Sequence, residues 1–235
     1  MLSQPQTALE IVSRVREAVP PPVPVTVKMR RAIDDTPESR DKFFTIFDGA
    51  FERGVAAITV HGRTVEQRYN GPSSWDILRE IKQHAGSRVV LGSGDAFTAE
   101  ACLEMMRHTG VDGVTAARGA IGNPWIFREA RALAAGLPLL DPPTLHEQRD
   151  ILREHFHLAM QVYDENRAAI MLRKFGIKYS ELHPRFLELR EAFVHISSLV
   201  EWDAVLAEWY HDDLPGRRRV IDADSPILSE TCEVA

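Results

Sequence analysis

Four strand-like runs decide the fold: VTVKMR (25–30), ITVHGRT (58–64), VVLGSGD (89–95) and VTAARGAIGNPW (114–125). They predict strands at Val25–Arg30, Ala56–His61, Arg88–Asp95 and Gly113–Arg118, each closed by a polar or glycine-rich turn. Strands that are largely apolar and alternate with helices are typical of a parallel sheet buried on both faces. Functional residues of such sheets lie at the carboxyl ends of the strands, where the unusual polar residues of these runs also lie.

Helical patterns surround these strands and then replace them. They cover about 6–19, 37–54, 74–85, 98–108 and 124–136. The proline-rich segment LPLLDPP (137–143) predicts a linker, and only helical patterns follow it, at about 144–164, 167–180, 185–199 and 201–211. We therefore expect a partial barrel in 1–136, a linker in 137–143, a small all-helical domain in 144–211 and a disordered tail in 212–235.

Four strand–helix units amount to half of a closed barrel. A TIM (β/α)8 barrel needs eight strands and about 250 residues, whereas only 136 residues precede the linker. The first helix also has no strand before it. We therefore expect the second half of a TIM barrel, units five to eight with the preceding helix, and an open four-stranded sheet is the alternative.

The composition argues against several classes of protein. The chain is 44% hydrophobic and 26% charged, as in soluble globular proteins, and its net charge of −6 argues against a simple basic nucleic-acid binder. Cys102 and Cys232 lack CxxC spacing, which argues against a disulfide framework or a zinc site and favours a reducing cytoplasm. No apolar run reaches the length of a membrane span, and the first residues do not resemble a signal peptide.

Two strand ends carry side chains that are unusual in a buried sheet. Lys28 shares one side of its strand with Thr26 and Arg30, so it either reaches solvent or presents a cation to an anionic ligand or cofactor ring. His61 is either a satisfied structural histidine or part of a site. Gly62 and Arg63 follow it directly, and they allow close backbone approach and place a guanidinium near an anion.

The other two strands end in turns that suit a phosphate. They are Gly92-Ser93-Gly94-Asp95 and Ala117-Arg118-Gly119. In barrels the loops after the last two strands commonly bind phosphate through backbone amides, and an arginine strengthens such a site. A single GxG turn has little specificity, because any tight strand–helix turn uses glycine. Two such turns on neighbouring strands indicate a phosphate site more strongly.

Together these motifs resemble the tRNA-dihydrouridine synthase family. The resemblance runs from about residue 6 to residue 211 and is most specific in VTVKMR, VHGRTVEQRYNGPSSW, GSGD and ARGAIGNPW. The stretch HGRT, followed by Gln67, Tyr69, Gly71 and Trp75, separates this family from other flavin barrels such as dihydroorotate dehydrogenases. The segment LRKFGIKYSELHP is similar to the family's helical tRNA-recognition domain.

The resemblance implies an oxidoreductase, a flavoprotein that uses FMN and NADPH to reduce the C5–C6 bond of uridine in tRNA. It places Lys28 and His61 at the flavin ring. It implies that the remaining cofactor-binding residues, at the phosphate end, are Ser93, Gly94, Asp95, Ala117 and Arg118. It implies that the substrate-binding residues are Arg30, Arg63, Gln67 and Tyr69.

This sequence departs from the family pattern at two points. Ser93 stands where many members have asparagine, and its hydroxyl keeps a hydrogen-bond donor. The family's proton-donating cysteine lies after an earlier strand, in an N-terminal half that this sequence does not contain. Cys102 lies inside a helical pattern and Cys232 in the tail, so neither replaces it. We therefore expect a truncated synthase that is inactive alone.

Two other functions fit parts of the pattern. One is a non-catalytic RNA-binding protein that uses only the helical domain, since 167–190 holds six Lys and Arg against two Glu. A solvated helix face would show the same charges. The other is a different FMN or sugar-phosphate barrel enzyme. A flavin spectrum separates that enzyme from the RNA binder.

Overall fold

A computed structural model describes residues 1–221 of the chain. The chain divides between Arg118 and Gly119 into two compact units, called here unit 1 (1–118) and unit 2 (119–221). The expected linker at 137–143 therefore does not coincide with this division, since the residues between Gly119 and the linker belong with the later helices.

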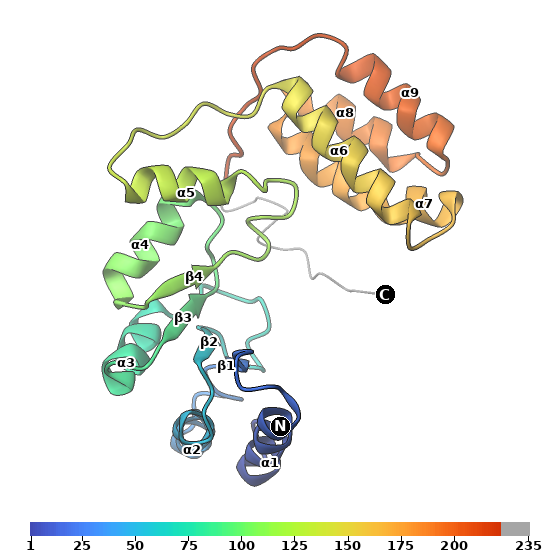
Figure 1. Cartoon of the computed structure of the whole chain (residues 1–235). Coiled ribbons are helices and arrows are strands. Elements are labelled where there is room, and N and C mark those ends of the chain that lie inside the picture. The colour runs from blue at the N-terminus through green and yellow to red at the C-terminus, as the bar shows by residue number, and fades with distance from the viewer. Residues whose placement is uncertain (222–235) are drawn as a thin grey trace. The chain divides into compact units, whose positions relative to one another are not determined.

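Unit 1 is a four-stranded parallel sheet with helices between its strands (Figure 1). The strands are β1 (Thr26–Arg30), β2 (Ala57–His61), β3 (Val90–Ser93) and β4 (Gly113–Thr115), and they pair in the order β1-β2-β3-β4. The helices are α1 (Pro5–Ala18), α2 (Pro37–Glu52), α3 (Trp75–Ala85) and α4 (Ala99–Thr109). The expected elements are confirmed, although β3 and β4 are shorter than predicted.

The two faces of this sheet differ in burial. Ile58, Val60 and Val90 are 0% exposed on the face that the helices cover. On the opposite face Thr26 and Lys28 of β1 are exposed, and Thr59 of β2 is half-buried. The expectation that every strand is buried on both faces is therefore wrong for this unit, because no described helix covers the second face. Four parallel strands with helices on one face are consistent with part of a TIM barrel.

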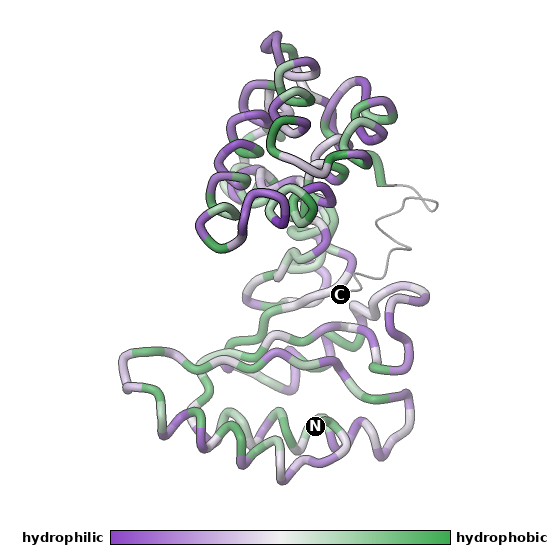
Figure 2. Tube along the Cα trace, turned by 90° about the vertical axis from the view of Figure 1, so that its right-hand side faces the viewer, coloured by the Kyte–Doolittle hydropathy of each residue, from purple (hydrophilic) through white to green (hydrophobic). Residues whose placement is uncertain are grey.

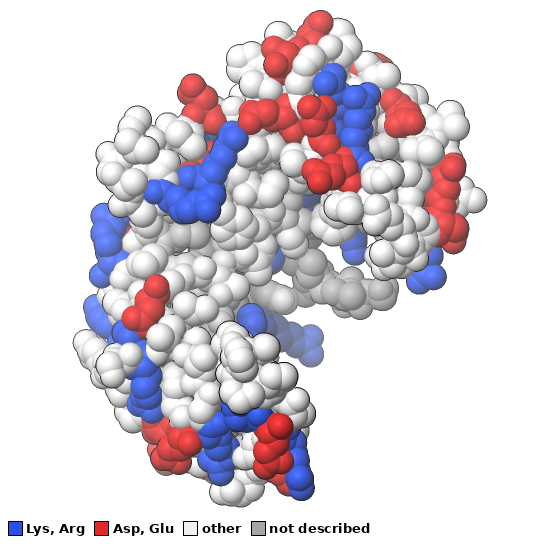
Figure 3. Space-filling model, in the orientation of Figure 1, with Lys and Arg blue, Asp and Glu red and all other residues white. Residues whose placement is uncertain are grey.

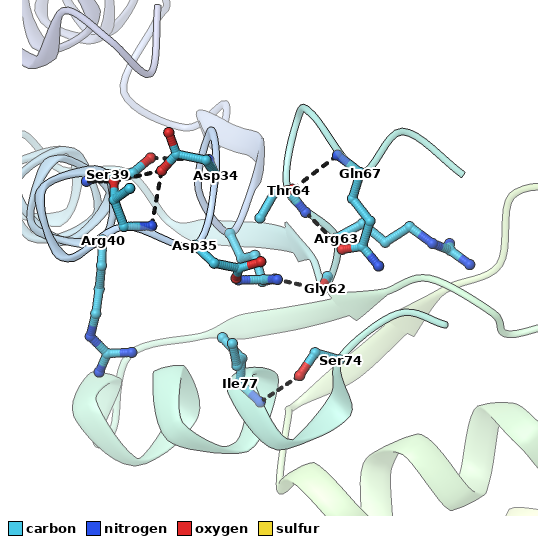
Figure 4. Close-up of polar contacts among 12 residues, drawn as sticks. Asp34, Asp35, Ser39, Arg40, Gly62, Arg63, Thr64, Gln67, Ser74 and Ile77 are labelled. Carbon is cyan, nitrogen blue, oxygen red and sulfur yellow. Dashed lines mark hydrogen bonds and ion pairs between the residues drawn. The ribbon is translucent and has the colours of Figure 1, made fainter. Parts of the chain in front are cut away.

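Capping side chains fix where several helices begin. Thr36, Ser74 and Thr98 each accept a hydrogen bond from the backbone N–H three residues later, at the starts of α2, α3 and α4. Figure 4 shows the bond from the Ile77 amide to Ser74. The helices that follow alternate hydrophobic and hydrophilic residues along their length (Figure 2). This pattern lets each helix bury one side.

Unit 2 is helical among the described residues. It contains α5 (Ile126–Ala134), α6 (Leu145–Met160), α7 (Glu165–Tyr179), the short η1 (Ser180–Leu182), α8 (Phe186–Val194) and α9 (Leu199–Trp209). Thr144 and Glu147 form a capping box at the start of α6. Helices α6 to α9 share a core whose least exposed members include Leu152, Phe156, Leu189, Phe193, Trp202 and Leu206.

The segment after α9 packs against unit 2. The expected tail begins at 212, yet Leu214 accepts a hydrogen bond from the Leu145 amide at 2.9 Å, and Arg217 donates its amide to Leu182 at 2.8 Å. Arg219 is 9% exposed and pairs with Glu181 at 2.7 Å. Its guanidinium also donates to the carbonyls of Gly119 and Ile121, at 3.1 and 2.7 Å. Residues 212–221 of the expected tail thus make ordered contacts with unit 2, and the rest of that expectation, 222–235, lies outside the described residues.

Candidate anion-binding site at the strand ends

The carboxyl ends of the four strands form one row across the sheet. The register pairs Arg30 with His61, His61 with Ser93, and Ser93 with Thr115. Lys28 pairs with Thr59 one step earlier on the same face. Gly94 and Asp95 directly follow Ser93. The topology therefore brings the strand-end residues that we selected from the sequence to a single edge.

The turn after β3 depends on glycine. Gly94 has φ 118° and Asp95 has φ 60°, both in the region that side chains with a Cβ rarely adopt. A Cβ at Gly94 would overlap the hydroxyl of Ser73 and lie 3.3 Å from Cε1 of His61. The backbone of this turn therefore lies against His61 and leaves no room for a larger residue.

Asp95 joins the loop after β2 to the turn after β3. Its carboxylate accepts two hydrogen bonds from Nη2 of Arg63, at 2.8 and 2.9 Å, and one from the Ser73 amide at 2.6 Å. Nη2 of Arg118 lies 3.4 Å from the same carboxylate. Asp95 is thus surrounded by donors of this chain. Among the residues expected at the phosphate end, Asp95 is the one with a negative charge.

Arg63 is a buried part of the framework. It is 3% exposed, and its Nε and Nη2 donate to the Gly71 carbonyl at 2.9 and 2.7 Å. Its Nη1 is buried and has no hydrogen-bond partner among the described residues. The guanidinium of Arg63, which the resemblance assigns to substrate binding, thus closes the 63–71 loop upon itself.

Gln67 also supports this loop. Its side chain donates to the Pro72 carbonyl at 3.0 Å and accepts the Thr64 amide at 3.3 Å, and Thr64 accepts the Gln67 amide in return. Figure 4 shows Thr64 and Gln67 facing each other across the turn. Arg30 donates from the end of β1 to the carbonyls of Thr64 and Arg68, at 2.7 and 2.9 Å. The 63–71 loop is thus held from within and from β1.

Tyr69 lies between two arginines at the tip of this loop. The guanidinium of Arg118 lies 4.7 Å from the Tyr69 ring centroid, and that of Arg30 lies 5.7 Å from it. Arg118 also contacts the ring of Phe97 at 4.9 Å. Cation–π contacts of this kind contribute roughly 0.5–2 kcal/mol each. Phe97 and Ser73 were not selected from the sequence, because nothing in their local pattern shows which loop they meet.

His61 is held as a neutral imidazole. Its pKa is lowered to about 4, first by burial and then by the positive charges of Arg30, Arg63 and Lys28, whereas Asp95 acts in the opposite direction. The Arg63 amide donates to Nδ1 at 3.2 Å, so Nδ1 is unprotonated and Nε2 carries the hydrogen. His61 is therefore a hydrogen-bond donor through Nε2. The charges acting on it are three cations and one carboxylate, a locally positive site.

Three more of the expected residues complete the edge. Lys28 is exposed and has no hydrogen bond or ion pair with any residue in 1–221. Ser93 is 2% exposed, and Ala117 is exposed one residue before Arg118. Ser93 thus lines the buried part of the edge, and Ala117 lies on its exposed part.

Cys102 lies in helix α4 and not in a strand or a strand-end turn. It is a buried residue of α4, and burial, followed by the nearby Glu100, raises the pKa of its thiol. A thiol with a raised pKa is a poor proton donor. Cys232 lies outside the described residues. Within 1–221 no cysteine is placed to serve the edge of the sheet.

A hollow of about 100 Å³ lies elsewhere in unit 1, between the turn after β1 and helices α2 and α3. Phe43, Phe44 and Ile81 line it together with Arg31 and Arg40. Both arginines already have carboxylate partners, since Arg31 pairs with Asp35 at 2.6 Å and Arg40 with Glu80. Figure 4 shows Asp34, Asp35 and Arg40 around this region. Both arginines of the hollow are thus already paired, and the carboxylate of Asp34, which also lines it, accepts hydrogen bonds from Thr36.

A second candidate surface lies on α7 and α8. Arg167, Lys174, Arg185 and Arg190 are exposed there, and Arg173 and Lys178 are half-buried. Arg185 pairs with Glu188. On the face shown in Figure 3, acidic and basic side chains are mixed. The positive charge of this surface is thus local and partly balanced.

Two kinds of feature are absent from the described residues. No group of three or more His, Cys, Asp or Glu in 1–221 could hold a metal ion. None of the helices in this range is long and apolar enough to cross a membrane.

Comparison with known proteins matches the same region. The family model described as Dihydrouridine synthase (Dus) covers residues 1–213. A probable tRNA-dihydrouridine synthase of Mycobacterium tuberculosis (strain CDC 1551 / Oshkosh) is 36% identical over 196 residues, which are 83% of this chain and 50% of that protein. The tRNA-dihydrouridine synthase B of Xanthomonas campestris is 33% identical over 207 residues, 87% of this chain and 61% of that protein.

The chain thus spans about half of the mycobacterial relative's length and about three-fifths of the other's. The family model covers the strand-end site, the 63–71 loop and the helices of unit 2 up to residue 213. Arg219 lies beyond that match. This chain belongs to the dihydrouridine synthase family.

Proposed function

We propose that this chain contributes an FMN site and a tRNA-binding helical unit to a tRNA-dihydrouridine synthase, which reduces the C5–C6 bond of uridine in tRNA. The observation that carries this proposal is the locally positive edge of the sheet. Lys28, Arg30 and Arg63 act on His61 there beside a glycine turn, Asp95 is the carboxylate that acts on His61, and Arg118 lies 3.4 Å from Asp95. An excess of cations beside a strand-end turn suits an anionic cofactor.

The residues of this edge fit FMN. Gly94 lets the turn after β3 lie against Ser73 and His61, and the following residue, Asp95, lies 3.4 Å from the guanidinium of Arg118. We propose that Ser93, Gly94, Ala117 and Arg118 hold the phosphate end, and that Lys28 and His61 face the ring. When bound, FMN supplies the hydride, and NADPH is the proposed reductant. Lys28 stabilises negative charge on the ring, and neutral His61 donates a hydrogen bond through Nε2 without adding charge.

Reduction of uridine also needs a proton at C5. Cys102 is buried in α4 with a raised pKa, so it does not reach the strand ends as an acid. We propose that the acid is supplied by polypeptide that corresponds to the rest of the relatives' length. The domain roles proposed from the sequence, a partial barrel before the linker and a tRNA-recognition part after it, remain part of this proposal, as does a cytoplasmic location.

An assay of a chimera tests this function. The chain would be joined to the part of the mycobacterial relative that it does not match, and dihydrouridine would be measured in unmodified tRNA with FMN and NADPH. Activity that falls strongly with Arg118→Gln supports the proposal. A folded chimera that binds tRNA but gains no flavin contradicts it.

Binding of RNA without catalysis is the second candidate function. Arg167, Lys174 and Arg190 favour it, since all three are exposed on α7 and α8 and no ion pair between them and another residue of 1–221 was found. This function predicts tRNA binding by the chain with no flavin absorbance and no flavin-dependent change in affinity.

A further inference from the structure

Asp95 has a charge that does not suit direct contact with a phosphate. A carboxylate next to a phosphate dianion is repelled by it, and the repulsion grows as water is excluded. The contacts found for this carboxylate are all with donors of the protein: Nη2 of Arg63, the Ser73 amide and Nη2 of Arg118. Its side chain is 20% exposed, so these donors surround most of it.

The position of Asp95 connects two parts of the site. Through Arg63 it reaches the Gly71 carbonyl and so fixes the 63–71 loop. Tyr69 of that loop lies against Arg118, 4.7 Å from its guanidinium. Arg118 is therefore contacted by the carboxylate of Asp95 and by the rings of Tyr69 and Phe97. The contact with Asp95 is direct, and Asp95 also helps to place Tyr69 through Arg63 and the 63–71 loop, which Arg30 holds as well.

We propose that Asp95 is a positioning residue, which does not touch the cofactor but holds Arg118 and the 63–71 loop in the arrangement that binds a phosphate monoester. This inference rests on the proposed function, because it concerns the same site. The backbone supports it: φ of 60° at Asp95 turns its side chain toward Arg63 and Ser73. Asparagine adopts this φ readily, so Asp95→Asn changes the charge with little backbone strain.

The direction in which phosphate affinity changes when Asp95 is removed separates a positioning role from a purely electrostatic one. If Asp95 acts only as a nearby negative charge, its removal strengthens phosphate binding. If Asp95 positions Arg118, its removal weakens phosphate binding although the site becomes more positive. Loss of one charge-assisted hydrogen-bond network corresponds to about a tenfold loss of affinity.

The test compares FMN with riboflavin, which lacks the phosphate, on the full chain. The variants are Asp95→Asn and a matched control, Asp112→Asn. Asp112 is also a carboxylate next to a strand, and it is held by Lys82 at 2.7 Å and by the Val90 amide at 2.8 Å. It directly precedes the start of β4, whereas Asp95 follows the end of β3. Flavin titration, and the arginine Nε–H signals of Arg63 and Arg118 in NMR spectra, are measured for each variant.

The expected result is that Asp95→Asn lowers FMN affinity by about tenfold, leaves riboflavin affinity unchanged and alters both arginine signals. Asp112→Asn changes none of these. Equal or stronger FMN binding by Asp95→Asn would overturn the inference. If the wild-type chain binds FMN and riboflavin with equal affinity, that result contradicts the proposed phosphate site, whatever the role of Asp95. The arginine signals then decide whether Asp95 holds Arg118, and unchanged signals in Asp95→Asn overturn the positioning role.

Discussion

The Arg63 amide donates a hydrogen bond to Nδ1 of His61 at 3.2 Å, from the residue whose guanidinium is buried against Asp95. One residue thus fixes the tautomer of the histidine and also anchors the loop above the sheet. The arrangement keeps His61 neutral, with its Nε2–H as the donor. It also makes the protonation of His61 a direct reporter of the site's positive charge.

The first prediction concerns the titration of His61. Its pKa of about 4 lies below the ordinary value of 6.5, so the unfolded chain binds more protons between these two values. We therefore expect the His61 ring signals to stay constant from pH 8 to about 5.5 in an NMR titration. Lys28→Met removes one of the repelling cations and should raise the pKa of His61.

The lowered pKa of His61 also makes the free energy of unfolding depend on pH. The contribution of neutral His61 is fully present above pH 6.5 and is lost as the pH falls through about 4. A His61→Gln variant should therefore lose less stability than the wild type when urea unfolding is compared at pH 7 and pH 4.5. Equal losses in the two proteins would show that His61 is not buried as described.

The second prediction concerns the turn after β3. Gly94→Ala places a Cβ against the Ser73 hydroxyl at φ 118°, so it should destabilise unit 1 by more than about 2 kcal/mol and abolish any preference for FMN. Gly86 is the matched control, because it also has a positive φ, 62°, but has nothing within 4 Å of an added Cβ. Gly86→Ala should cost about 1 kcal/mol and leave flavin binding unchanged. Similar effects of the two substitutions would argue against the tight packing of the turn.

The third prediction concerns Arg219. Arg219→Met leaves the half-buried Glu181 without its partner and frees the carbonyls of Gly119 and Ile121, so we expect a loss of about 2–4 kcal/mol in chemical denaturation. Arg218 is exposed and lies 3.5 Å from Glu129, and Arg218→Met should cost less than about 1 kcal/mol. Equal stability of the Arg219 variant and wild type would mean that this segment does not hold unit 2 together.

The fourth prediction concerns tRNA. Neutralising Arg167, Lys174 and Arg190 with glutamine should weaken binding of a mixed tRNA preparation and reduce the slope of log affinity against log salt by roughly two. Arg107 of α4 is an exposed control in unit 1, with a side-chain exposure of 71%, and its neutralisation should change the slope little. Binding that does not respond to salt would contradict the phosphate-contact account.

The sequence predicted the sheet and the shared edge well, because both follow from local patterns. Apolar runs that end in glycine turns gave the strands, and parallel order then required His61, Gly94 and Arg118 to meet. The burial of Arg63 could not be predicted, since it depends on Asp95, which lies 32 residues further along the chain. Arg219 was missed for the same reason, because its partners Gly119 and Glu181 are distant in sequence.

The fifth prediction concerns catalysis by the chain alone. Cys102 is buried in α4 and is not placed as an acid, so we expect no dihydrouridine synthesis from the purified chain with FMN, NADPH and unmodified tRNA. A general acid typically contributes about 10²–10⁴-fold, so its absence should be evident in the rate. Robust turnover that Cys102→Ala abolishes would mean that the acid has been misplaced.

The preference for FMN over riboflavin tests the central claim most directly, because the two flavins differ only in the phosphate that the strand ends are proposed to hold. We expect weak binding of FMN by the wild-type chain, weaker still binding of riboflavin, and loss of this difference in Arg118→Gln, all measured by flavin fluorescence titration. Equal affinities of the wild-type chain for the two flavins, or a preference that Arg118→Gln leaves intact, would contradict the assignment of the strand ends as the phosphate site.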